Sequence, residues 1–120
     1  MSLKQSSLDP AQAAAEQSPG CWHRDRNRSC LRIEASPTET FLFPYSQFVA
    51  AHHARSDDSE TLLISFSSHE VTVAGQRLGD IAAALQDLSV NWVKTLPARY
   101  RSLTQFDGAV VTQIEVKPVE

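Results

Sequence analysis

The apolar residues of this chain are sparse before residue 38 and clustered after it. From Thr38 onward, β-branched, aliphatic and aromatic residues alternate with polar ones at a period of two, which is typical of half-buried strands. We therefore predict one α+β domain over residues 38–118, preceded by an N-terminal arm over residues 1–37. The arm is expected to be mostly irregular, with a short helix over residues 10–17.

The strand-like runs are short and follow one another closely. Residues 60–67 alternate most regularly, and the polar loops on either side of them are only a few residues long. Because short connections join antiparallel strands, the pattern predicts an antiparallel meander of four to six strands. The expected strands are residues 31–33, 40–43, 47–55, 60–67, 69–74 and 109–117.

The polar loop at residues 56–59 fixes a register for the central hairpin. If Arg55 faces Glu60, the two side chains can form an ion pair at the rim, and Val49 lies opposite Phe66. Directly opposed residues share one face of a sheet. The core face would then carry Val49, Ala51, Leu62, Ile64 and Phe66, and the other face Phe48, Ala50, His52, Leu63 and Ser65.

The hydrophobic period changes after Gly75. Apolar residues now recur every three or four positions, as on one side of a helix. They are Leu78, Ile81, Ala82, Leu85 and Leu88. We predict one principal helix over residues 78–88 that packs against the open face of the meander. Residues 89–96 fit either a strand or a continued helix, and their weak helix formers favour the strand. Residues 98–106 are expected to form a short helical turn.

Composition narrows the class of protein without naming a function. The 120 residues carry a formal net charge of −3, which argues against a surface that binds nucleic acid all over. The polar start resembles no signal peptide, and no run approaches the roughly 18 apolar residues of a membrane span. We expect a cytoplasmic protein that does not enter a membrane, with its two cysteines reduced.

The arm holds the strongest local concentration of positive charge. Trp22, Arg24, Arg26 and Arg28 combine a stacking ring with guanidinium groups, a pairing that binds nucleic acids. Three arginines give weak binding at physiological salt, and Asp25 offsets one of them. The competing interpretation is that these arginines pair with acidic groups of the same protein.

Metal and catalytic chemistry have little support. Cys21, His23 and Cys30 lack the spacing of a zinc knuckle, and no second cysteine pair follows. His52 and His53 are adjacent in a predicted strand, so they point to opposite faces and cannot bind one metal together. We expect no metal, no cofactor and no catalytic residue.

One face of the predicted sheet would leave an apolar patch if a single helix covers the other. The candidate interface residues are Phe41, Phe43, Phe48, His52 and Leu63. Exposed apolar patches of this kind mark interfaces, unless the arm folds back over them. The segment at residues 41–78 resembles small bacterial domains in general, and this resemblance implies no activity.

The sequence thus favours a noncatalytic protein-binding or assembly module that self-associates through a sheet face or edge. One alternative is nucleic-acid binding through residues 21–32. The other is a small-molecule or enzymatic pocket between helix and sheet. Its candidate residues are Tyr45, His53, His69 and Trp92.

Overall fold

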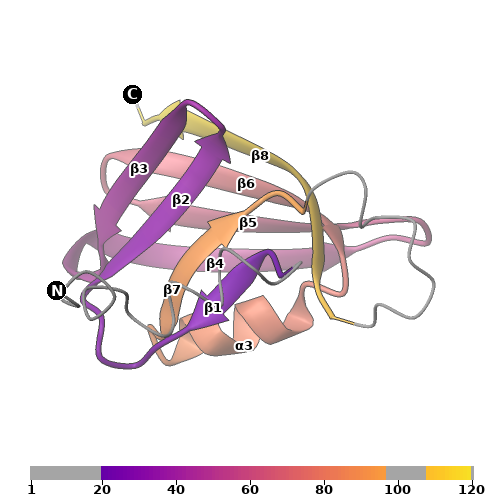
Figure 1. The fold of residues 1–120 in the computed structure, drawn as a ribbon, viewed down its shortest axis with the longest axis horizontal. Helices are drawn as coiled ribbons and strands as arrows, with labels where there is room; N and C mark the ends of the chain where they lie inside the picture. Colours follow the sequence, from indigo (N-terminus) through magenta and orange to yellow (C-terminus); the bar gives the residue numbers. More distant parts are fainter. Residues whose placement is uncertain (1–19, 97–107, 120) are drawn as a thin grey trace, which may run out of the picture.

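The described part of the chain folds into two four-stranded sheets with one short α-helix between them (Figure 1). The computed structural model describes residues 20–96 and 108–119. Sheet A has the order β1 (Trp22–Arg24), β7 (Val90–Lys94), β2 (Cys30–Ser36), β3 (Glu39–Pro44). Sheet B has the order β4 (Phe48–Arg55), β5 (Glu60–Phe66), β6 (His69–Gln76), β8 (Val110–Pro118). The α+β class is confirmed, but the single meander packed on a helix is wrong, because the strands divide between two sheets.

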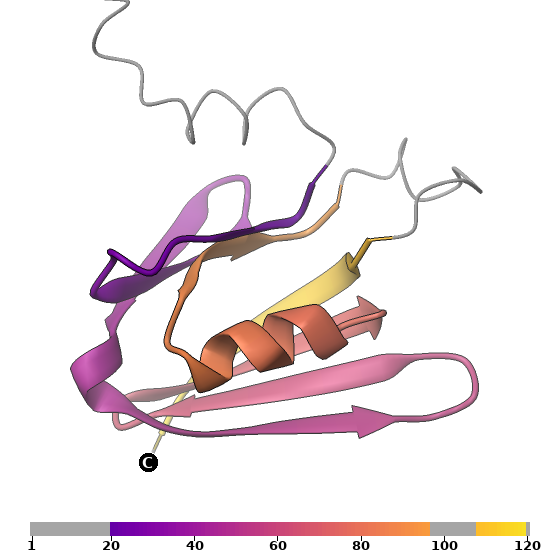
Figure 2. The ribbon, with the colours of Figure 1, turned by 90° about the horizontal axis from the view of Figure 1, so that it is seen from below.

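The two sheets face each other across a shared core. Figure 2 shows sheet A above, sheet B below, and α3 (Gly79–Gln86) between the two layers at one side. The helix contacts β4 of sheet B and β7 of sheet A, so it closes the gap between the layers there. No helix among the described residues is long and apolar enough to span a membrane.

A short 3-10 helix lies where the chain passes from one sheet to the other. Tyr45–Gln47 follows β3 and leads the chain out of sheet A into β4. The backbone N–H of Tyr45 donates to the carbonyl of Ser29 at 2.9 Å, and its hydroxyl donates to the carbonyl of Val90 at 2.6 Å. Both partners are distant in sequence. The local pattern therefore resembles an ordinary turn, and tertiary contacts convert it into a change of layer.

The predicted β4–β5 register is confirmed over most of its length. Arg55 lies opposite Glu60, and Ala51 opposite Ile64. The prediction is wrong at the start of β4, where a bulge makes Phe48 the partner of Phe66. Val49 is the extra residue, and its side chain is 64% exposed instead of buried.

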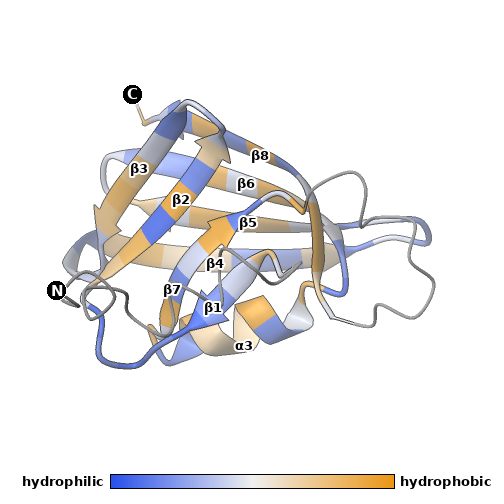
Figure 3. Ribbon diagram, viewed as in Figure 1, coloured by the Kyte–Doolittle hydropathy of each residue, from blue (hydrophilic) through white to orange (hydrophobic). Residues whose placement is uncertain are grey.

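The core joins the inner faces of both sheets. Alternating apolar and polar positions along the strands are visible in Figure 3, and Leu62, Ile64 and Phe66 of β5 are buried as predicted. The ring of Phe43 in sheet A stacks on that of Phe66 in sheet B, with ring centroids 4.5 Å apart. Aromatic stacking therefore links the two layers directly.

Two strands of sheet A, β1 and β2, come from the predicted N-terminal arm at residues 1–37. The predicted strand at residues 31–33 is confirmed and lengthens to β2, whose Leu31 and Ile33 are fully buried. β2 pairs antiparallel with β3 and parallel with β7, and β1 pairs with the other side of β7. Parallel pairing between such distant segments has no local sequence pattern.

The remaining predictions of local structure have mixed outcomes. The helix is confirmed within the expected residues 78–88, and the strand preferred for residues 89–96 is confirmed as β7. The expected helix at residues 10–17 and the helical turn at residues 98–106 lie outside the described residues.

Gly75→Ala is expected to lower the free energy of unfolding by at least about 2 kcal/mol. Gly75 lies at a bulge where β6 and β8 approach closely, and an added Cβ would overlap the carbonyl oxygen of Val110. Urea denaturation of the full chain measures the change. Gly79→Ala is the matched control, because a Cβ there would meet only the His53 ring, at an ordinary 3.9 Å. A similar loss in both variants would contradict the close approach.

Candidate protein-binding surface at the β4 edge

Strand β4 is the most open edge of the described sheets. It has one neighbouring strand among the described residues, β5, and six of its eight residues are exposed. Alanine fills three positions, and Arg55 at the end is the one residue with a permanent charge. A long edge without Lys, Pro or acidic side chains offers its free N–H and C=O groups to another strand.

The helix stands beside this edge and not directly behind it. In Figure 1, α3 lies beyond the free side of β4, and in Figure 2 it lies between the two layers. A strand added to β4 would therefore have α3 over its inner face. The space between helix and strand is an apolar groove of about 390 Å³. Its lining residues are Phe48, Ala51, Ala82, Leu85, Gln86 and Leu88.

Leu88 is held in this groove by an unusual backbone conformation. Its φ is 55°, in the left-handed region that favours glycine, and its side chain is 40% exposed. The conformation ends α3, since the N–H groups of Leu88 and Ser89 donate to the last carbonyls of the helix. Residues held in sparsely populated backbone conformations cluster at active sites and ligand-binding segments.

At the other end of β4, the carboxylate of Glu60 holds the start of α3. It accepts hydrogen bonds from the N–H of Leu78 at 2.9 Å, the N–H of Arg77 at 3.2 Å and Nε2 of His53 at 2.8 Å. Arg77 has a φ of 55° and Leu78 a φ of −86°, an alternation that turns successive N–H groups toward one anion. Glu60 therefore caps a helix that has no cap of its own.

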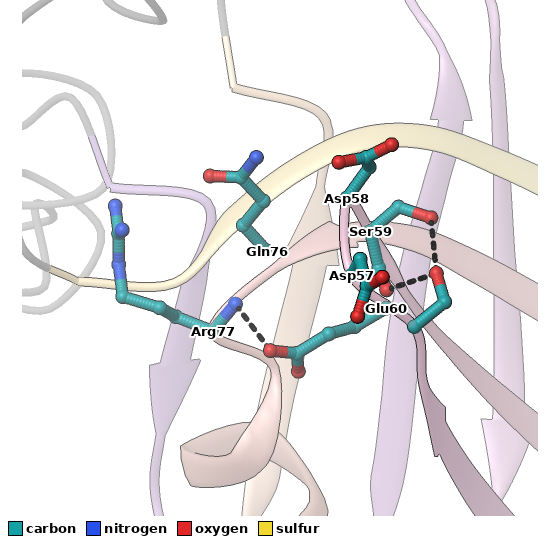
Figure 4. Close-up of a pocket in the computed structure, with 7 residues that line it drawn as sticks. Asp57, Asp58, Ser59, Glu60, Gln76 and Arg77 are labelled. Atoms are coloured by element: carbon teal, nitrogen blue, oxygen red, sulfur yellow. Dashed lines mark hydrogen bonds between the residues drawn. The ribbon is translucent and has the colours of Figure 1, made fainter.

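Figure 4 shows this carboxylate at the edge of a polar hollow of about 260 Å³ between the β4–β5 turn and the β6–α3 connection. The hydrogen bond from His53, followed by that from Leu78, holds the pKa of Glu60 below its ordinary value. The expected ion pair of Glu60 with Arg55 is absent, because other donors occupy the carboxylate. Arg55 forms no ion pair with the acidic groups of the described residues.

The five predicted interface residues do not lie on one surface. Phe43 is buried in the core, and Phe41 and Phe48 pack against it. His52 and Leu63 lie opposite each other on the outer face of sheet B. An interface role for this set stays a prediction, but three of its aromatic rings already have partners inside the fold.

The arginines of the predicted nucleic-acid contact lie against acids of the same chain. Arg24 and Arg26 both contact the Asp87 carboxylate, at 2.7 and 3.3 Å, and Arg28 contacts Asp25 at 2.9 Å. Trp22 packs against the core. These contacts favour the competing interpretation of internal pairing, and nucleic-acid binding stays an untested prediction.

The cysteines and histidines of the sequence lie in or beside several separate strands. Among the residues that the structure describes, no three side chains of His, Cys, Asp or Glu lie close enough to hold an ion. Cys21 precedes β1 and Cys30 lies on β2, on either side of β7. Strands two positions apart are about 10 Å apart, beyond the roughly 7 Å that a disulfide spans. Both cysteines are free.

The predicted small-molecule residues each have a different partner inside the fold. The hydroxyl of Tyr45 donates a hydrogen bond to the carbonyl of Val90, and burial raises the pKa of Tyr45 to about 12. His53 binds Glu60, and His69 lies against the rings of sheet A. Trp92 stacks on His23. None of these residues lines the groove beside α3.

Val49 and Leu88 are the residues of this surface that the sequence analysis missed. Both were assigned to apolar core stripes, because period alone cannot show a bulge or a left-handed helix end. The one indication in the sequence that the helix ends near Leu88 is the fall in helix propensity at the next two residues, Ser89 and Val90. Comparisons with protein-family models, curated proteins and solved structures find no match for this chain. The surface is therefore interpreted from its own geometry.

Glu60→Gln is expected to lower the free energy of unfolding at pH 7 by about 1–2 kcal/mol, since hydrogen bonds to a charged acceptor become neutral ones. The folded-state pKa of Glu60 is lowered, so its contribution is full above the ordinary glutamate pKa of about 4.3. It is lost as the pH falls through the lower folded-state value. Urea denaturation at pH 7 and pH 3 measures the difference.

The deficit of Glu60→Gln should shrink at the lower pH. Asp58→Asn removes the same charge from an exposed position on the adjacent turn, and we expect little change from it. An equal deficit at both pH values would contradict a charged cap.

Proposed function

We propose that this protein is a noncatalytic binding module that takes up an extended segment of a partner protein alongside β4. The observation that carries this proposal is the pairing of a free, almost uncharged strand edge with an apolar groove under the neighbouring helix. In strand addition, backbone hydrogen bonds provide affinity and pockets for alternate side chains provide specificity. The β4 edge offers both.

The other sheet edges are better protected. β1 has three residues and ends at an arginine, and β3 ends at Pro44. β8 is longer, but it carries Glu115, Lys117 and Pro118 along its exposed half. Charges, prolines and short lengths are the usual protections against strand addition. This comparison supports β4 as the binding edge among the described strands.

An extended segment fits this edge better than a second copy of the chain. Two-fold pairing of β4 with the β4 of another copy would keep both inner faces on one side of the joined sheet. Both α3 helices would then compete for the same space, because each stands on the free side of its own β4. A single strand without a helix avoids this conflict.

The polar groups of the site support a binding role. The groove lining contains no charged side chain. The Glu60 carboxylate accepts a hydrogen bond from the N–H of Leu78 at the start of α3, and it accepts another from His53. Neither group points a free proton donor or acceptor into the groove.

Selection of a random peptide library on the immobilised full chain is expected to enrich extended sequences with apolar residues at alternate positions. Ala51→Lys should weaken these peptides by at least about tenfold, the equivalent of about 1.4 kcal/mol, because it places a charge in the groove. Gln113→Lys adds the same charge to the exposed face of β8 and should leave binding unchanged.

Light scattering of the full chain runs beside this selection. The proposal requires a monomer that binds peptide. A dimer abolished by Ala51→Lys would assign the edge to a second copy instead. Selected peptides that bind both lysine variants equally would contradict peptide binding at the β4 edge.

A further inference from the structure

The two ends of the β4 edge differ in charge. Arg55 at the C-terminal end is exposed and forms no ion pair with a described acid, since Glu60 opposite it is held by His53 and by backbone N–H groups. The Asp80 carboxylate lines the same hollow, of about 340 Å³, and forms no ion pair with Arg55. A cation left without its cross-strand partner can pair with a carboxylate on an added strand.

The direction of α3 along β4 also makes the two ends of the edge electrostatically different. The start of α3 lies at the His53 end of β4, since Gly79 is in contact range of that ring. The end of α3 lies at the Phe48 end, where Leu88 and Phe48 line one groove. Helix N-termini favour acidic groups and helix C-termini disfavour them. Glu60 and Asp80 already occupy the N-terminal end of α3, so the attraction for an added acid at this end comes from the Arg55 guanidinium, while the C-terminal end of the helix disfavours an acid near Phe48.

The direction of the added strand decides which of its ends meets Arg55. Every pairing within sheet B is antiparallel, and antiparallel pairs are the more stable per residue. In an antiparallel addition, the first residue of the new strand lies beside the last residue of β4. The following inward side chains then pass over Ala51, whose small size leaves room in the groove.

We infer that the bound segment runs antiparallel to β4 and begins with an acidic residue beside Arg55, followed by apolar residues at alternate positions that fill the groove under α3. This inference rests on the strand addition proposed above and specifies the chemistry of its partner.

The test uses two acetylated and amidated peptides of identical composition, with serine alternating with leucine and valine. One begins with aspartate and the other ends with it. Fluorescence polarisation on the full chain should show the aspartate-first peptide binding about fivefold tighter, as expected for a partly exposed charge pair. Arg55→Gln should remove this preference without preventing binding. Lys117→Gln, an exposed cation on β8, should preserve it.

Equal binding of the two peptides, or a preference for aspartate at the end, would overturn the inferred direction. So would a preference that survives Arg55→Gln. If neither peptide binds while library-selected peptides do, this inference fails and the strand-addition function stands. Loss of the preference at high salt would support the ion pair, because exposed charges are screened there.

Discussion

The structure depends on a helix that is shorter than the strand it accompanies. The eight residues of α3 span about 12 Å, whereas the eight residues of β4 span about 27 Å. The helix contacts both sheets and seals the core between them at this side. It cannot also cover the whole edge of β4. The uncovered part of the β4 edge follows from this difference in length.

Local features of the fold could be predicted because local patterns determine them. The helix around Ile81, the hairpin register at Arg55 and Glu60, and the strand around Trp92 follow from period, propensity and loop length. The division into two sheets could not be predicted this way. It depends on Tyr45 reaching Ser29 and Val90, contacts between segments that no local window contains.

The candidate surface was harder to predict, because its main features are departures from regular period. A bulge turns Val49 out of the core, and the left-handed backbone conformation of Leu88 turns its own side chain toward water. The loss of the Arg55–Glu60 ion pair has a similar origin. The Glu60 carboxylate accepts hydrogen bonds from the backbone N–H groups at the start of α3 and from His53, and not from Arg55. The rule that directly opposed residues on adjacent strands pair with each other takes no account of a helix from another part of the chain.

The stability of the fold alone does not explain the residues at this edge. A glycine at position 88 would fit the left-handed backbone with less strain, and a lysine or proline along β4 would protect the free edge. The chain instead has leucine at the helix end and alanines along the strand. Each choice leaves apolar surface in water, and both choices meet in one groove. Local rules are most often broken where a protein binds something, and here two are broken at the same place.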